Sequence, residues 1–143
     1  MRGNITDESL GFPTTGYERV RDADSLLFAG QWPGAYYLAG YAVECALKAC
    51  VARLTNQHDF PDKVFAARCY THNIETLVEA ANLIALRNAE GKVNVPFGKN
   101  WTLVKDWNEA SRYLIWSEAQ ARKLYAAVND PATGVFPWIA ARW

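Results

Sequence analysis

The sequence predicts an all-α fold, an up-and-down helical bundle of four to five main helices, and three observations carry this prediction. Apolar residues recur at steps of three and four along several segments, which is the spacing of one face of an α-helix. No segment alternates apolar and polar residues with the period of two that is typical of a strand. Clusters of glycine, proline and asparagine separate the periodic segments, so we expect short connections between helices.

The first half of the chain predicts two helices after an N-terminal arm. Residues 1–16 contain glycines and a proline with little apolar periodicity, so we expect a flexible arm followed by a single domain over 17–143. A first helix is expected over 17–29, with Gly30 at the position of a C-terminal stop. The second helix, over 33–54, has the clearest apolar stripe in the sequence, and Pro33 suits its first turn.

The second half predicts three more helices. Residues 55–71 are interpreted as a connection, and a third helix is expected from Ile74 until Gly91 ends it. The stretch 91–99 is dense in helix breakers. A fourth helix is expected over 100–116 and a fifth over 117–129, with a kink between them, before a turn-rich segment and a short apolar tail.

Composition indicates one compact domain without a metal site or a disulfide framework. Half of the 143 residues are hydrophobic, and 15 basic side chains balance 15 acidic ones, which argues against disorder and against a basic tail that coats nucleic acid. Cys45, Cys50 and Cys69 form no close pair, and two histidines are too few for a zinc site of the His/Cys type. No apolar stretch has the length of a signal peptide or a membrane span. We therefore expect a cytoplasmic protein with no metal, no cofactor and no membrane contact.

The second helix carries a polar edge in addition to its apolar stripe. Tyr37, Tyr41, Glu44 and Lys48 follow one another at spacings of 4, 3 and 4 residues, so they share one edge of the helix. One interpretation is a solvated Glu44–Lys48 ion pair beside two half-buried tyrosines. The other is a ligand or dimer face, because tyrosine combines contact area with a polar group. Gly40 lies on the same helix and suggests that another helix approaches closely there.

The residues of this helix resemble a known family. The run 35–49, AYYLAGYAVECALKA, resembles the central helix of HEPN domains (higher eukaryotes and prokaryotes nucleotide-binding domains). Residues 21–27 resemble the first helix of that family, 72–77 resemble its H-x-L-x-x-L helix start, and Arg112-Tyr113 is similar to its R-Y pair. The resemblance implies a helical bundle that forms a homodimer, binds nucleotides or RNA, and is often encoded or fused with a minimal nucleotidyltransferase in toxin–antitoxin-like systems.

The ribonucleases of the HEPN family place a histidine four to six residues after an arginine, and this chain departs from that pattern. Arg112 is the best match for the arginine, but no histidine follows it in the window. Arg53 and His58 have the required spacing but lie at the end of the second helix. His72 is a further candidate, although a role in capping or orienting the third helix is the simpler interpretation, as is a structural ion pair for Arg112.

The six tryptophans are expected mainly to pack the core. Trp101 and Trp107 have core spacing in the fourth helix, and Trp116, Trp138 and Trp143 are expected to pack the tail onto the bundle. A role in base stacking would need exposed rings beside basic groups. Such groups are present around the fourth helix, as Lys99, Lys105 and Arg112.

Three hypotheses follow for the function. The first is a dimeric, non-catalytic module for nucleotide or RNA recognition that works with a nucleotidyltransferase-type partner. The second is a metal-independent ribonuclease toxin, and the third is an oligomeric scaffold. We expect convergence of Arg112, His72, Glu44 and Lys48 in one cleft at the dimer interface to favour a phosphate-handling site.

Overall fold

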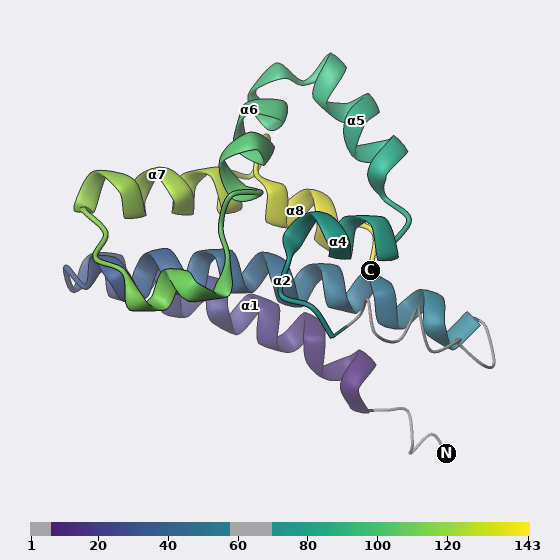
Figure 1. Cartoon of the computed structure of the whole chain (residues 1–143), viewed down its shortest axis with the longest axis horizontal. Coiled ribbons are helices and arrows are strands. Elements are labelled where there is room, and N and C mark those ends of the chain that lie inside the picture. Colours follow the sequence, from purple (N-terminus) through teal and green to yellow (C-terminus); the bar gives the residue numbers. More distant parts are fainter. Residues whose placement is uncertain (1–6, 58–69) are drawn as a thin grey trace.

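The chain folds as an all-α helical bundle in this computed structural model, which describes residues 7–57 and 70–143 and, within them, the side chains of 11–54 and 70–143. These residues form seven α-helices and one 3-10 helix, η1, and contain no strand. The predicted fold class is therefore confirmed. Figure 1 shows two long helices lying side by side, with the shorter helices packed over them.

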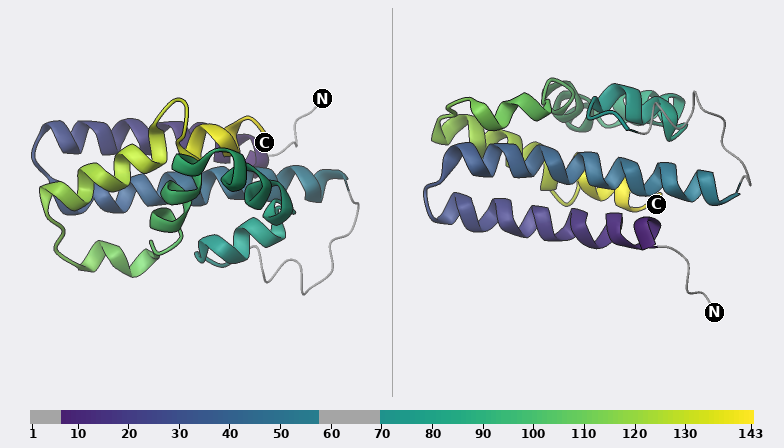
Figure 2. Two further views of the ribbon diagram at one scale, coloured as in Figure 1. Left: turned by 90° about the horizontal axis from the view of Figure 1, so that it is seen from above. Right: turned by 60° about the horizontal axis from the view of Figure 1, so that its bottom comes forward.

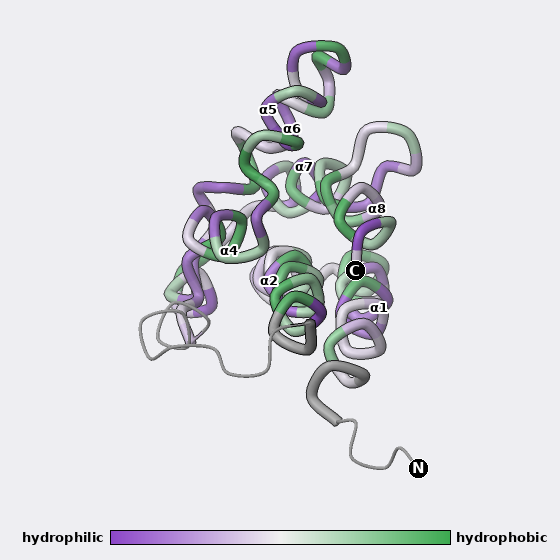
Figure 3. Tube along the Cα trace, turned by 90° about the vertical axis from the view of Figure 1, so that its right-hand side faces the viewer, coloured by the Kyte–Doolittle hydropathy of each residue, from purple (hydrophilic) through white to green (hydrophobic). Residues whose placement is uncertain are grey.

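Helices α1 (Asp7–Phe28) and α2 (Trp32–Gln57) form the long antiparallel pair. The chain turns between them at Gly30, whose φ of 77° is in the left-handed region, so the predicted stop is confirmed. Helix α2 contacts α1, α4, α7, α8 and η1, and it is apolar on most of its circumference for that reason. Figure 2 shows α1 and α2 side by side, and Figure 3, which looks along these two helices, shows α2 between α1 and α4 with α7 and α8 above the pair.

The predicted start of the first helix at Tyr17 is wrong, because α1 begins at Asp7. Of the predicted arm, residues 1–6 lie outside the described residues. Tertiary contacts explain the helical part: Gly16 is buried, and a Cβ there would meet the Phe136 ring at 3.2 Å. Phe136 belongs to the C-terminal helix α8 (Val135–Ala140). A long-range contact therefore stabilises helix where local composition predicted none.

The predicted third helix is two helices, α4 (Ile74–Ala80) and α5 (Ile84–Val93). Asn82, with a φ of 60°, breaks the helix. The amide of Asn82 donates to the carbonyl of Glu79, and the amide of Leu83 donates to the carbonyl of Val78, which is the hydrogen-bond pattern of a Schellman C-cap. Asparagine is the residue other than glycine that adopts this conformation most readily.

Gly91 does not end a helix, and the stretch 91–99 is not a connection. Gly91 lies inside α5 and faces Gly98 of α6 (Val95–Val104), where a Cβ would meet the Gly91 carbonyl oxygen at 3.3 Å. Asn94 caps α6 by accepting from the amide of Phe97. The glycines that were interpreted as breakers therefore let two helices approach closely.

The predicted fourth helix over 100–116 is also wrong in extent. Helix α6 ends at Val104, and η1 (Glu109–Tyr113) follows after a turn. The predicted fifth helix is confirmed as α7 (Glu118–Asn129), in which Ser117 and Gln120 form a capping box. The kink between the two predicted helices is in fact a longer break that includes η1.

The tryptophans pack, as expected. Trp101 and Trp107 are buried, and the Trp116 ring stacks on Tyr36 with centroids 3.7 Å apart. Trp138 packs against Phe97, and Trp143 packs against Tyr17. The Trp101 indole N–H also donates to Glu75.

Glu75 is held by two donors, Trp101 and Arg87. Burial alone would raise the pKa of Glu75, but the hydrogen bonds from these two donors outweigh it and lower the pKa below its ordinary value.

In residues 7–57 and 70–143, no helix has the combination of length and apolar character that crossing a bilayer requires.

Candidate functional site

Five polar side chains from three parts of the chain meet on one side of α2. Glu44 and Lys48 belong to α2, His72 lies just before α4, and Glu109 and Arg112 belong to η1. Each contacts the next through an ion pair, in the order Lys48, Glu44, His72, Glu109, Arg112. We call these five residues the His72 cluster.

Glu44 is the buried member of the cluster. Its side chain is only 1% exposed, and its Oε2 lies 2.9 Å from the Lys48 Nζ and 2.7 Å from the His72 Nδ1. The interpretation of Glu44–Lys48 as a solvated surface pair is therefore wrong, because η1 and the segment before α4 cover this edge of α2. A carboxylate buried this deeply is stable only when it is paired.

His72 bridges two carboxylates. Its Nδ1 faces Glu44, and its Nε2 lies 2.8 Å from the Glu109 Oε2. Each contact is a hydrogen bond in which the ring nitrogen donates when that nitrogen carries a proton and the carboxyl group is ionised. Of the roles predicted for His72, capping is wrong, since Asn73 is the N-cap of α4 and accepts from the amide of Thr76; the contact with Glu44 is compatible with the other two, orienting the start of the helix and packing against the bundle.

The 3-10 helix η1 supplies the outer members of the cluster. The Glu109 Oε1 lies 3.5 Å from an Arg112 terminal nitrogen. The same guanidinium donates to the Tyr113 hydroxyl at 2.8 Å and lies over the Tyr113 ring, 4.8 Å from its centroid. Arg112 therefore makes an ion pair, as expected, and remains 45% exposed.

Sequence reasoning missed Glu109, and it named Tyr113 only as part of the R-Y pair, with no role at the site. Glu109 lies 37 positions after His72 in the sequence (109 − 72), so no local spacing connects them. The only available signal was its i, i+3 relation to Arg112, which is common on surface helices. Tyr113 is 74% exposed and provides the ring beside a basic group that base stacking requires.

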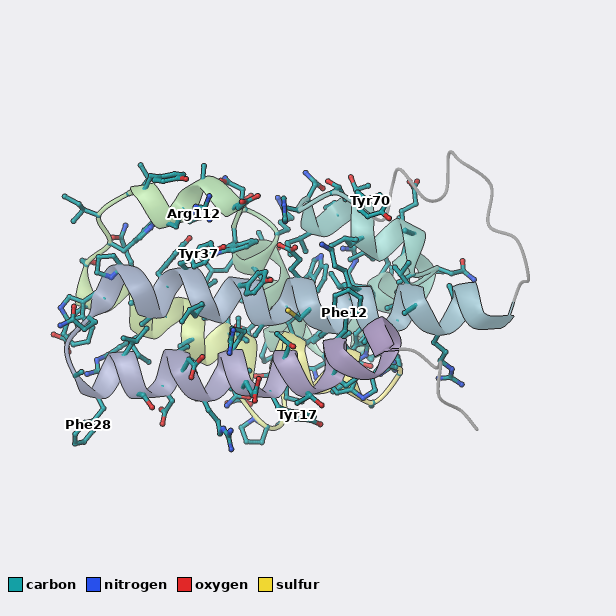
Figure 4. The ribbon with its side chains drawn as sticks, turned by 90° about the horizontal axis from the view of Figure 1, so that it is seen from below. Phe12, Tyr17, Phe28, Tyr37, Tyr70 and Arg112 are labelled. Atoms are coloured by element: carbon teal, nitrogen blue, oxygen red, sulfur yellow. The ribbon has the colours of Figure 1, made fainter. Side chains whose placement is uncertain are left out.

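The aromatic rings of Tyr37 and Tyr41 lie on α2 beside the cluster. Their rings stack with centroids 5.9 Å apart, and Tyr37 also packs against Trp107. Figure 4 shows Arg112 of η1 and Tyr37 of α2 facing each other. Burial raises the pKa of both tyrosine hydroxyls, so they remain neutral and able to donate a hydrogen bond near neutral pH.

Contact between Gly40 and Trp107 fixes the chain immediately before η1. A Cβ at Gly40 would lie 2.3 Å from the Trp107 ring. The close approach expected at Gly40 is therefore made by an indole side chain from a turn and not by a second helix. This contact places η1, with Glu109 and Arg112, over the edge of α2 that carries Glu44.

The other predicted site residues are not in the cluster. Arg53 is nine residues beyond Glu44 on α2, about 13.5 Å along the helix axis, and its guanidinium donates to the Arg142 carbonyl oxygen at 3.0 Å. His58 lies outside the described residues. Arg112 is thus linked to His72 through Glu109, whereas Arg53 contacts Arg142 near the C-terminus.

The basic residues predicted around the fourth helix do not form one patch with Arg112. Lys105 pairs with Asp106. Lys99 lines a separate groove of about 630 Å³ between α6 and α7, together with Asn100, Leu103, Asp106, Lys123 and Thr133. None of the His72 cluster lines this groove, and the cluster is the stronger candidate site because its groups contact one another.

The His72 cluster and the tyrosines beside it define the chemistry available on this surface: the ammonium of Lys48, the guanidinium of Arg112, a histidine between two carboxylates, and exposed or half-buried tyrosine rings. Within the described ranges, no group of three or more His, Cys, Asp or Glu side chains is placed to hold a metal ion.

This chain was compared with models of protein families, with curated proteins and with solved structures, and no family, protein or structure matched it.

Proposed function

We propose that this chain is a HEPN-like recognition module that binds nucleotides or single-stranded RNA at the His72 cluster without cleaving them. The observation that carries the proposal is the convergence of Lys48, Glu44, His72, Glu109 and Arg112 from three separate elements. Charged side chains brought together from distant parts of a chain are costly to desolvate, so their meeting favours a functional site over chance.

The accessible groups of the cluster suit a phosphate and a base. Arg112 and His72 are the partly exposed nitrogen-bearing groups, with side chains 45% and 47% exposed, and a guanidinium matches the geometry of phosphate oxygens. The Tyr113 ring next to Arg112 is available for stacking on a base. Since the chain as a whole has no net charge, this local arrangement and not a general field must attract the ligand.

Fluorescence anisotropy with a labelled single-stranded RNA, at low and at physiological ionic strength, tests the proposal. Arg112→Ala should weaken binding by about five- to tenfold and reduce the salt dependence by about one phosphate contact. The matched control is Arg122→Ala, because Arg122 is also an exposed, ion-paired arginine but lies on α7. No binding by the unaltered protein, or an equal loss in both variants, contradicts the proposal.

A metal-independent ribonuclease is the second candidate, and the contact of His72 and Arg112 with the same carboxylate favours it. A histidine with one unprotonated nitrogen can accept the proton of the attacking 2′-hydroxyl and then donate it to the departing 5′-oxygen, while an arginine holds the phosphate. Cleavage of RNA in the presence of a chelator, lost in His72→Ala, would support this activity. Growth arrest that persists in the His58→Ala, His72→Ala double variant would contradict it.

We further propose that the module is a homodimer and that it works with a nucleotidyltransferase-type protein, as the resemblance implies. Leu114 and Ile115 are 55% and 93% exposed directly after η1, and large exposed apolar side chains favour burial against another chain. Light scattering at micromolar concentration should show a dimer that Ile115→Ser weakens. Phe28→Ser, at the exposed end of α1 (Figure 4), is the control. A monomer contradicts this proposal, and an oligomer that binds no RNA favours the scaffold hypothesis.

A further inference from the structure

The carboxylate of Glu109 lies where a ligand phosphate would be expected. One of its oxygens is 2.8 Å from the His72 Nε2, and the other is 3.5 Å from an Arg112 terminal nitrogen. A carboxylate and a phosphate both present two oxygens to such donors, so the groups that bind one also bind the other. His72 and Arg112, the two groups of the proposed RNA site that would contact a phosphate, therefore already contact an anion of the chain itself.

The two carboxylates of the cluster differ in how firmly they are held. Glu44 is 1% exposed and accepts from both Lys48 and His72, whereas Glu109 is 35% exposed. Glu109 also lies in the first turn of η1, a short 3-10 helix, and the backbone there is anchored by other residues: Ser111 is buried and its carbonyl accepts from Trp116. The Glu109 side chain can consequently rotate into solvent while η1 and Glu44 stay in place.

Charge balance gives a reason why a phosphate would displace the Glu109 carboxylate from the cluster. Apart from the histidine, the cluster holds two positive groups, Lys48 and Arg112, and two negative ones, Glu44 and Glu109, so loss of the Glu109 carboxylate from it leaves an excess of positive charge. While Glu109 is in place, its negative charge repels a phosphate that approaches His72 and Arg112. Once it has moved, the His72 Nε2 and the Arg112 guanidinium lose their contacts with Glu109 and can bind a phosphate, while Arg112 keeps its bond to the Tyr113 hydroxyl and Glu44 still contacts the opposite nitrogen of the ring.

We propose that Glu109 acts as an internal phosphate mimic, and that a phosphate group of the RNA or nucleotide binds by displacing it from His72 and Arg112. This inference rests on the proposed function. It identifies the ligand group at the cluster as a phosphate and identifies Glu109 as the residue that limits affinity for it.

Removal of the Glu109 charge tests the inference. Glu109→Gln keeps the size of the side chain, and the variant should bind single-stranded RNA about five- to tenfold more tightly than the unaltered protein. The control is Glu118→Gln, which removes the same charge from an exposed ion pair with Arg122 on α7 and should change affinity by less than about twofold. In the Glu109→Gln, Arg112→Ala double variant the gain should be lost, because the freed donor is absent. Circular dichroism of each variant confirms that it is folded.

Nuclear magnetic resonance of the His72 ring gives an independent measurement on the unaltered protein. Addition of inorganic phosphate should shift the Nε2 resonance and leave the Nδ1 resonance, which faces Glu44, nearly unchanged. Lower phosphate concentrations should suffice in Glu109→Gln. The mononucleotide and the RNA should produce the same Nε2 shift, because all three probes share the phosphate.

The outcomes separate this inference from the proposed function. RNA binding by the unaltered protein that Glu109→Gln leaves equal or weakens overturns the displacement but not the recognition module. An equal gain in Glu109→Gln and Glu118→Gln also overturns it, because a general charge effect then explains the gain. Absence of RNA binding in both the unaltered protein and Glu109→Gln overturns the proposed function, and with it the role of Glu109.

Discussion

Substitution of Gly40 by alanine tests how the structure positions η1. The new Cβ would lie 2.3 Å from three atoms of the Trp107 ring, Cγ, Cδ1 and Nε1, whereas ordinary contact begins at 3.4 Å. The ring must therefore move by about 1.1 Å, the difference of the two distances. Trp107 is only 2% exposed and packs against Tyr37, so there is little free space for this movement.

The expected cost can be worked out from two opposing terms. Overpacking of a well-filled core costs up to about 3 kcal/mol, and replacement of a glycine inside a helix by alanine returns about 1 kcal/mol through backbone entropy. Gly40→Ala should therefore lower the free energy of unfolding by about 2 kcal/mol. Urea denaturation followed by circular dichroism measures this difference.

Two further variants make the explanation specific. Gly11→Ala in α1 is the control, because nothing lies within 4 Å of a Cβ there, so it should gain up to about 1 kcal/mol. In a Trp107→Leu background the clash is relieved, and Gly40→Ala should then be neutral or stabilising. If Gly40→Ala instead stabilises the unmodified protein as Gly11→Ala does, Trp107 does not pack on Gly40 and the placement of η1 is wrong.

Three other predictions follow from buried or paired groups. Glu44→Ala should lower the free energy of unfolding by about 3 kcal/mol, because it empties a buried position and removes the carboxylate that pairs with Lys48 and His72, while Glu118→Ala in an exposed pair should cost less than about 1 kcal/mol in the same urea titration. Glu75 has a lowered pKa in the folded state, so its stabilisation is complete above the ordinary glutamate pKa and is lost as the pH falls through the folded value. The stability difference between the unaltered protein and Glu75→Gln should therefore shrink from about pH 7 to about pH 3, and a difference independent of pH would refute the assignment. Cys45 and Cys50 are buried, and burial raises the pKa of each thiol to about 11. In a variant with the third cysteine, Cys69, replaced, a thiol reagent near neutral pH should therefore react much faster with the denatured protein than with the folded protein. Equal rates would show that the thiols are accessible.

The sequence predicted the elements whose pattern is dense and local. Helix α2 and helix α7 were found nearly to their ends, because a continuous apolar stripe and the Ser117 cap are both readable in the chain itself. The breaks were less predictable, since glycine is ambiguous. Gly30 ends a helix by adopting a positive φ, whereas Gly16 and Gly91 lie inside helices against neighbouring groups, and only the packing distinguishes these cases.

The candidate site was likewise predicted only where its residues follow a local pattern. The spacing along α2 identified Tyr37, Tyr41, Glu44 and Lys48 as one edge, because helical periodicity is a property of the local chain. It could not show that Glu44 is buried, nor that Glu109 joins His72 to Arg112, because those contacts connect segments far apart in the sequence.

By itself, then, the sequence determined an all-α chain with a strongly periodic central helix, a scarcity of histidine and a polar edge, all of which follow from composition and local spacing. The tertiary structure alone decided that one of the two histidines lies between two carboxylates and beside Arg112. The physical reason is that η1 reaches this position through the packing of the Trp107 indole on Gly40, a contact between residues 67 positions apart (107 − 40). No local preference encodes such a contact, because it exists only when the whole bundle is assembled.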